Sequence, residues 1–307
     1  MTAVQPLDAR TLKWVEYVDE SALGTFPTNP TMTAFPGLVT NFNFTSGPEL
    51  DKYSYFKSAT DTDPLSSGTA TKSGETHTWS VELKMSALGL LPHALMATNT
   101  TTYAPGVTHL PFSIGAKIGA DFTTFTGCII TSWVVDIPDM TSAATLTIEG
   151  MAFNRTDFST TYVGTGAHAT APTDAVLTMG SVANVQYDNA STETADLYMG
   201  SLRFGVQNNV TPVLDVGSSL ASKYTNYSLG PREFVLEVDS VLLGTAAIDD
   251  AKDGAAHEFE FDFGGKTFTF TNVIWDNSPS VDCNPEDLIG FSLSAEPTSA
   301  RLAITTA

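Results

Sequence analysis

The feature that most constrains the fold of this chain is a long internal repeat. Residues 125–130 (FTGCII) align with residues 270–275 (FTNVIW) at an offset of 270 − 125 = 145 residues. The alternating segments 146–148 and 291–293 keep the same offset, since 291 − 146 = 145. A repeat of this length is longer than the unit of a solenoid, so we expect a tandem of whole domains.

The repeat continues upstream, where insertions in loops change the offset. Residues 79–83 (WSVEL) match residues 234–238 (FVLEV), and residues 42–44 (FNF) resemble residues 204–206 (FGV). A chain of 307 residues can form two domains that each bury a core. We therefore predict an N-terminal arm at 1–34, a first β-domain at 35–156, a linker at 157–175 and a second β-domain at 176–307.

Apolar residues alternate with polar ones through most of the chain. In the segment 257–263 (HEFEFDF), three phenylalanines face one side and three acidic residues face the other, which is the period of a half-buried strand. Helical character is confined to 85–99, where Gly89 and Pro92 shorten it, and to a weaker counterpart near 241–252. The sequence predicts a mainly β protein of two tandem β-sandwich or barrel domains, each with a short helix.

Two segments are predicted to lie outside the sheets. The arm at 1–34 contains several prolines, which fix φ and remove a hydrogen-bond donor, so we expect it to run extended over a surface instead of entering a sheet. Residues 47–76 are predicted to form a long loop, either a device that binds a partner or a disordered segment. The corresponding loop of the second copy, 208–231, is shorter.

The composition indicates a structural protein more than an enzyme. The formal net charge is −20, which repels nucleic-acid phosphates. The five histidines are isolated, and no nucleophile, phosphate-loop or metal-ligand motif is present. We expect no catalytic residue, no metal and no cofactor, although a pair of glycosidase carboxylates can be hidden in such a β-protein. No apolar segment approaches a membrane span, so we expect no membrane partner and a protein that is made and used in a cytoplasm.

Three segments in order carry a resemblance to a known family. Residues 20–32 (ESALGTFPTNPTM), the strand-like residues 77–84 (HTWSVELK) and residues 202–210 (LRFGVQNNV) together resemble the tail tube proteins of tailed bacteriophages and related archaeal viruses. The resemblance implies β-sandwich or barrel units whose inner sheets join around a ring, with rings stacked around a channel for DNA. Because this chain carries the unit twice, three copies would make a pseudo-hexameric ring.

The resemblance also implies the partners and the location. Copies of the same chain, other tail proteins and the tape measure protein would be the partners, and viral DNA would pass through without specific binding. The protein would belong to the virion tail, assembled in the host cytoplasm. The arm and the long loop would reach the next ring, and the aromatic anchors would be Trp14, Tyr17, Tyr53, Tyr55 and Phe56. Packing of these rings against their own domain is the alternative.

Acidic residues opposite an apolar stripe are the candidates for a channel lining, because a negative wall keeps a polyanion moving. These are Glu82, Glu237, Asp239, Glu258 and Glu260. A solvated outer face is the alternative for all five. Two other functions stay open at this stage: a virion decoration or adhesin-like protein built from tandem β-sandwiches, and a carbohydrate-active enzyme.

Overall fold

The computed structural model describes residues 12–53, 69–98, 103–162, 167–187, 197–214, 224–242, 254, 256–275, 290–296 and 300–306. Over these residues the protein has two antiparallel sheets, of eleven and four strands, and one short α-helix, α1 (Leu91–Leu95). The mainly β prediction is confirmed. The described strands form open sheets and do not close into a barrel, and most of the segment predicted to form the second helix lies outside the described residues.

The larger sheet branches at β6 (Asp121–Ile137), because the two ends of this strand have different neighbours. The first end pairs with β5 (Phe112–Ile118) and β8 (Asn154–Arg155). Beyond β5 lie β1 (Leu12–Asp19) and then β2 (Thr33–Ala34). We name this set of strands the short branch.

The second end of β6 belongs to a set of strands that we name the long branch. There β6 lies between β7 (Thr145–Ala152) and β10 (Leu197–Leu214). The long branch runs in the order β3 (Gly37–Tyr53), β4 (Thr69–Met85), β7, β6, β10, β11 (Tyr224–Leu242) and β14 (Gly290–Ser294). It therefore continues without interruption from strands of the N-terminal half to strands of the C-terminal half.

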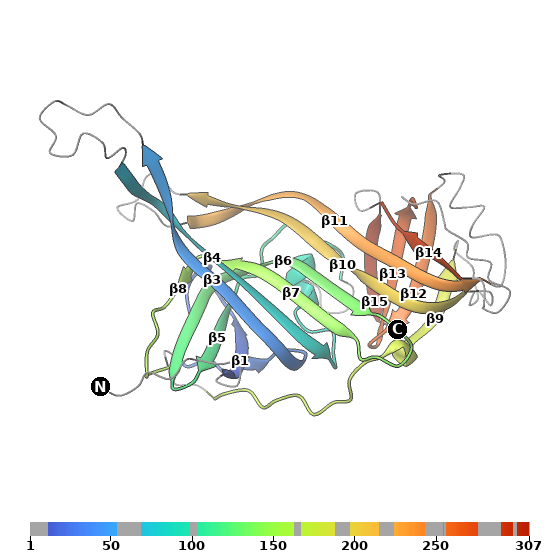
Figure 1. Ribbon diagram of the computed structural model, residues 1–307, viewed down its shortest axis with the longest axis horizontal. Helices are drawn as coiled ribbons and strands as arrows, with labels where there is room; N and C mark the ends of the chain where they lie inside the picture. The colour runs from blue at the N-terminus through green and yellow to red at the C-terminus, as the bar shows by residue number, and fades with distance from the viewer. Residues whose placement is uncertain are drawn as a thin grey trace, which may run out of the picture.

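The separate sheet has four strands, all in the second half. Its order is β15 (Arg301–Thr306), β13 (Lys266–Val273), β12 (His257–Phe263) and β9 (Val182–Tyr187). In Figure 1 the long branch crosses the molecule, with the short branch beneath its β3–β4 end and the four-stranded sheet beneath its β11–β14 end.

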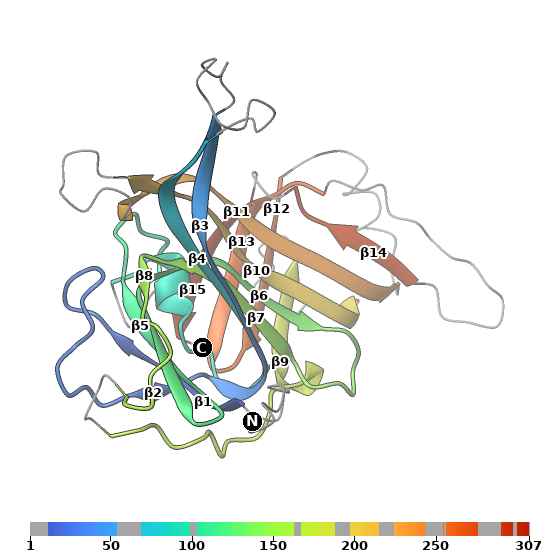
Figure 2. The same cartoon turned by 60° about the vertical axis from the view of Figure 1, so that its left-hand side comes forward.

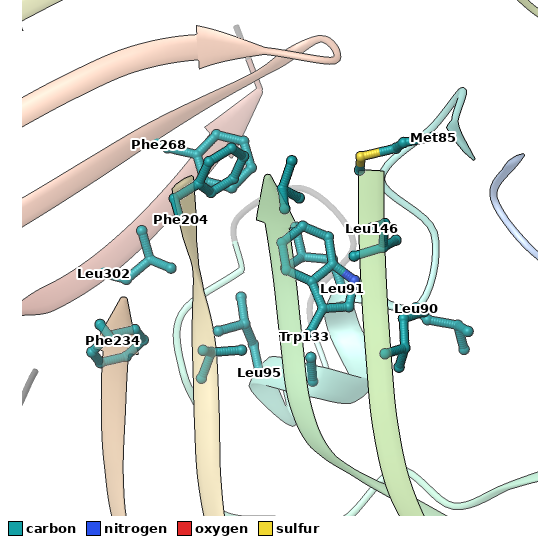
Figure 3. Close-up of a cluster of buried hydrophobic side chains, with 14 of the residues drawn as sticks. Met85, Leu90, Leu91, Leu95, Trp133, Leu146, Phe204, Phe234, Phe268 and Leu302 are labelled. Atoms are coloured by element: carbon teal, nitrogen blue, oxygen red, sulfur yellow. The ribbon is translucent and has the colours of Figure 1, made fainter. Parts of the chain in front are cut away.

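Among the described residues, the larger of two hydrophobic clusters fills the space between these layers and contains side chains of both halves. Phe204 of β10 lies 6.2 Å from Trp133 of β6, and 4.9 to 5.0 Å from Phe268 and Phe261 of the four-stranded sheet, measured between ring centroids. Figure 3 shows Trp133 and Leu91 of the first half beside Phe204 and Phe268 of the second. These contacts show that the two halves share one core. Because apolar burial is the main stabilising term in folding, each half depends on the other for its stability.

The hairpins β5–β6 and β12–β13 have the same register at an offset of 145 residues. Ile114 pairs with Phe125 and Phe259 with Phe270, and in both hairpins the register shifts one step before these pairs. Residues at the same offset also take positive φ, at 63° for Gly127 and 57° for Asn272. Sequences that share only an alternating pattern would not be expected to share a bulge at the same position.

The hairpins β3–β4 and β10–β11 also correspond. Phe44 pairs with Trp79, and Val206 pairs with Phe234, which are the positions that the sequence alignment matched. Both hairpins continue beyond the sheet: the predicted loop 47–76 is paired over 47–53 and 69–76, and the predicted loop 208–231 is largely paired as well. Figure 2 shows the β3–β4 hairpin projecting from the body of the molecule.

The N-terminal segment also differs from the extended arm that the sequence predicted. Residues of β1 pair on both sides, with β5 and with β2, so this segment is part of a sheet. Pro27 and Pro30, which suggested an extended arm, follow this strand and do not interrupt its pairing. Glu16 holds the later chain against β1, because its carboxylate accepts hydrogen bonds from His168 Nδ1 (2.7 Å) and the Ala169 amide (2.8 Å).

Candidate functional surface

The outward face of the long branch is the most distinctive polar surface of the described chain. Along each strand the core-facing residues are apolar, as in the buried series Val81, Leu83 and Met85 of β4. The residues between them point away from the core and are mainly hydroxyl, amide and carboxylate side chains. This face runs across both halves because the branch itself does.

The charge of this face is negative. Its acidic side chains on the described core strands of the branch are Glu82, Asp136, Glu149, Glu233, Glu237 and Asp239, and its basic ones are Lys84 and Arg203. The formal sum is 2 − 6 = −4. Both bases have partners on the face, since Lys84 Nζ donates to Thr145 Oγ1 (2.7 Å) and Arg203 Nη1 donates to Glu237 Oε1 (2.6 Å). A surface of this kind repels phosphate groups and offers few cations to hold them.

One cross-strand rung shows how the two halves are joined on this face. Five residues on successive strands from β4 to β11 lie directly opposite one another: Lys84, Thr145, Asp136, Arg203 and Glu237. Opposite charges therefore face one another across the β6–β10 boundary and the β10–β11 pair. Exposed charge pairs of this kind contribute little to the free energy of unfolding, so we interpret them as determinants of strand register.

The boundary between β6 and β10 is termed the seam. It pairs Ser132–Ile137 with Leu202–Gln207, six residues on each side. At Gly205 the strands are too close for a side chain, because an added Cβ would lie 2.3 Å from the Trp133 carbonyl oxygen and 2.8 Å from Val134 Cα. Both are main-chain atoms, so only glycine allows this approach.

A buried polar network fixes the second half to the first beside the seam. Asn208 Nδ2 donates to the carbonyl oxygens of Ala94 (2.8 Å) and Ile130 (3.1 Å). Arg232 donates from Nε to Asn208 Oδ1 (2.7 Å) and from Nη2 to the Gly106 carbonyl (3.0 Å). Burial lowers the pKa of Arg232 from its usual value. Each buried polar atom named here has a partner, which is the condition for such a network to stabilise the fold.

A second contact joins the far part of the β10–β11 hairpin to the first half. The Tyr227 hydroxyl donates to the Gly127 carbonyl (2.9 Å), and its ring stacks on Phe153 at 4.4 Å. The Gly127 amide in turn donates to Glu20 Oε1 (2.8 Å), and Ser113 Oγ donates to the same oxygen (2.5 Å). Burial raises the pKa of the Glu20 carboxyl above its ordinary value.

The five acidic candidates from the sequence lie on two different faces. Glu82 of β4 and Glu237 and Asp239 of β11 are on the outward face of the long branch, where Asp239 accepts a hydrogen bond from Ser201. Glu258 and Glu260 are on β12, on the outward face of the four-stranded sheet, across the core from the other three. One channel wall formed by either sheet would therefore contain only one of these two sets.

The aromatic candidates that the structure describes pack within the chain. Trp14 contacts Phe122, Tyr162 and His168 at centroid distances of 4.6 to 5.7 Å. Tyr17 lies 5.5 Å from Phe35, and burial, with a smaller effect of Asp19, raises its pKa to about 12. Tyr53 ends β3, in a part where side chains are not described, and Tyr55 and Phe56 lie outside the described residues.

Sequence reasoning missed the residues that join the halves: Gly205, Asn208, Arg232 and Tyr227. The repeat did contain a signal for Asn208 and Arg232. At the offsets of the two hairpins they match Ser46 and His77 (208 − 46 = 162 and 232 − 77 = 155), so both copies have a pair of polar residues at the same two positions. Gly205 gave no signal, since the need for glycine comes from a strand far away in the sequence.

Comparisons with known proteins add no family: neither the models of protein families nor the curated proteins gave a match. Among the described residues, no three His, Cys, Asp or Glu side chains are grouped so that they could hold a metal ion. None of the helices in this part of the chain has the length and apolar character needed to span a membrane. The function must therefore be argued from the sheet architecture.

Proposed function

We propose that this chain is a structural protein of a virus tail, which assembles into the tube through which DNA leaves the capsid. The two tandem units supply two neighbouring positions of a ring. One contains the hairpins β3–β4 and β5–β6, and the other contains the corresponding hairpins β10–β11 and β12–β13. Three chains then form a ring of six similar positions, and rings stack into the tube. The role is architectural, with no catalytic step.

The observation that carries this proposal is the long branch, which passes from one repeat unit to the next through the seam. A sheet that joins two units side by side can join further units in the same way, and closure into a ring removes the open edges that otherwise promote aggregation. The resemblance of residues 20–32, 77–84 and 202–210 to tail tube proteins supports the same architecture.

The polarity of the long branch supports its assignment as the wall of the channel. Its outward face has Glu82, Glu237 and Asp239 and few free cations, so a passing polyanion is repelled and does not bind. Under this assignment Glu258 and Glu260 lie on the outer side of the tube. Other tail proteins and the tape measure protein are the partners at the ends and in the bore.

Electron microscopy of the purified protein at high concentration tests the proposal. We expect rings or tubes with a central passage, threefold symmetry and two similar positions per chain, with the long branch facing the passage. Particles without a passage, or a passage lined by the four-stranded sheet, would contradict it. A protein that instead binds host glycans as a single chain would favour the adhesin-like alternative.

Charge reversal separates the two acidic faces in the assembled tube. In Glu82→Lys/Asp239→Lys we expect DNA to be retained inside the tube and protected from nuclease, with retention lost as salt is raised. The matched control, Glu258→Lys/Glu260→Lys, makes the same change of charge on the other face and should leave any bound DNA accessible to nuclease. Equal protection in both variants would refute the assignment of the bore.

The projecting hairpin β3–β4 is the element that we assign to ring stacking. Its paired part beyond the sheet, at 47–53 and 69–76, projects from the body of the molecule. Replacing residues 48–75 with a short turn should leave single rings intact and abolish long tubes in micrographs. Tubes of normal length from this variant would show that stacking uses another surface.

A further inference from the structure

An arginine occupies a core-facing position of β11. Alternation along this strand puts Arg232 on the same side as Phe234 and Leu236, which are at most 4% exposed. A guanidinium has five N–H donors, and Arg232 uses two of them, Nε toward Asn208 Oδ1 and Nη2 toward the Gly106 carbonyl. Both acceptors are neutral, so these hydrogen bonds leave the positive charge uncompensated.

In the described part of the chain, no carboxylate forms an ion pair with Arg232. Arg155 and Arg203, by contrast, each lie within 4.0 Å of a carboxylate oxygen. Burial lowers the pKa of Arg232, and no described acidic group opposes that effect. A half-buried cation without a counter-ion costs free energy, and an anion bound beside it offsets this cost.

A cavity of about 550 Å³ borders the guanidinium, and we name it the Arg232 pocket. Its walls come from β11, from β15 and from the segment 103–107. They consist of Pro105, Pro231, Arg232, Phe234, Arg301 and Leu302. Figure 3 shows two of the apolar members, Phe234 and Leu302, next to each other. This volume, with apolar walls and a few polar groups, is typical of a site for a small ligand.

Main-chain contacts hold the wall formed by the segment 103–107. The Tyr103 amide donates to the Ile304 carbonyl (2.9 Å), and the Gly106 amide donates to the Leu95 carbonyl (2.8 Å). An added Cβ at Gly106 would lie 2.2 Å from the Met96 carbonyl oxygen, so the segment packs closely against the end of α1. The pocket is therefore formed before any ligand arrives, which lowers the entropic cost of binding.

The chemistry of the pocket favours an anion with an apolar body. Arg301, an exposed second guanidinium, borders the same pocket, and its Nη1 donates to the Ala300 carbonyl (2.9 Å). The planar fork of a guanidinium matches the two oxygens of a carboxylate, whereas the apolar walls offer mainly carbon to the rest of a ligand. A polyanion is disfavoured, because the formal net charge of −20 repels it. We therefore expect a ligand with one negative charge.

We infer that the Arg232 pocket binds a carboxylate attached to an apolar group, with the carboxylate on Arg232 and the apolar group against Phe234 and Leu302. Two sources share this chemistry, a free organic acid and the C-terminal end of a peptide. The inference goes beyond the proposed function and does not rest on it.

Ligand-observed nuclear magnetic resonance on the full-length protein tests the site with defined probes. We expect hexanoate to bind with a dissociation constant on the order of millimolar, as befits a ligand of this size. Hexylammonium has the same apolar chain with the opposite charge, and it should not bind. Inorganic phosphate has the negative charge without the chain, and it should not displace hexanoate at equal concentration.

Two variants locate the binding. Arg232→Gln removes the buried charge, and Arg301→Glu reverses the exposed charge of the same pocket. We expect each to weaken hexanoate binding at least about tenfold, because each removes an attraction for the carboxylate. The matched control is Arg203→Glu, which makes the same change of charge as Arg301→Glu on the outward face of the long branch and should bind as the wild type does.

Circular dichroism and urea unfolding establish which variants fold. If Arg232→Gln does not fold, Arg301→Glu and its control decide the test, since both of these arginines are exposed. Failure of hexanoate to bind the wild type far above millimolar concentration would overturn the inference. Equal binding of hexanoate and hexylammonium, displacement by phosphate, or equal binding by Arg301→Glu and Arg203→Glu would overturn it as well.

A further comparison identifies the source of the carboxylate. An acetylated tripeptide of leucine with a free C-terminal carboxylate is compared with its C-terminal amide. Binding of the carboxylate form that is tighter than that of hexanoate, and lost in the amide, identifies the end of a peptide chain. Binding weaker than that of hexanoate identifies a free organic acid.

These outcomes are separate from those for the proposed function. Hexanoate binding by a protein that forms no tubes would support the pocket and refute the tube. Tubes that do not bind hexanoate would refute the pocket and leave the tube in place.

Discussion

The substitution Gly205→Ala tests whether the seam holds the two halves together. The added methyl would meet two main-chain atoms of β6, at 2.3 Å from the Trp133 carbonyl oxygen and 2.8 Å from Val134 Cα. An ordinary non-bonded contact is about 3.5 Å or longer. The strands β6 and β10 must therefore separate by about 1 Å at this point, which strains the six-residue pairing on both sides.

The magnitude follows from a comparison with Gly47→Ala. A Cβ at Gly47 meets nothing within 4 Å. Both variants gain about 0.4–1 kcal/mol from the reduced freedom of the unfolded chain, so this term cancels in the difference. Overpacking at Gly205 costs about 1–3 kcal/mol, and we expect Gly205→Ala to be less stable than Gly47→Ala by that amount.

Urea unfolding followed by tryptophan fluorescence is a suitable assay, because Trp133 is buried at the seam. Since the core is shared, the wild type should unfold in one transition, and Gly205→Ala should unfold at lower urea with a broader or split transition. The reasoning is refuted if the two alanine variants unfold at the same urea concentration with the same slope. That result would mean that the halves are joined elsewhere.

Three further predictions concern the contacts beside the seam. Asn208→Ala should cost about 1–3 kcal/mol in urea unfolding, because Arg232 loses its acceptor, whereas the exposed neighbour variant Asn209→Ala should stay within about 0.5 kcal/mol of wild type. Tyr227→Phe should cost about 0.5–1.5 kcal/mol in the same assay, since it removes the hydrogen bond to the Gly127 carbonyl, and an unchanged stability would contradict this bond. Burial raises the pKa of Glu20 in the folded protein above its ordinary value near 4.5. The free energy of unfolding is therefore largest when this carboxyl is protonated, and it falls as the pH rises from about 4.5 through the raised pKa. A pH series of urea unfolding should show this negative slope reduced in Glu20→Gln, and an unchanged slope would refute the assignment.

The local alternation of the sequence predicted most of the strands. The expected segment 257–263 agrees with the bounds of β12, because this strand has apolar residues at every second position. The strand β1 was missed because the prolines that follow it were given more weight than the alternation within it. The far part of the β3–β4 hairpin was missed because its strands, 47–53 and 69–76, are mainly polar and carry no alternating apolar signal.

The candidate surface could be predicted only in part. Alternation places Glu82, Glu237 and Glu260 away from a core, and the structure agrees for each. It does not say which sheet a strand joins, and this is why acids of two opposite faces were grouped together. The seam depends on the pairing of β6 with β10, whose partners are about seventy residues apart, and non-local pairing of this kind leaves no local pattern.

The polypeptide that connects β6 to β10 also changes the conditions under which the edge of β6 is covered. A tether of moderate length holds its two ends at an effective concentration on the order of millimolar, far above that of most free proteins. The edge of β6 is therefore covered by β10 even in a dilute, newly made chain. A β10–β11 hairpin on a separate chain would instead have to reach this edge by diffusion.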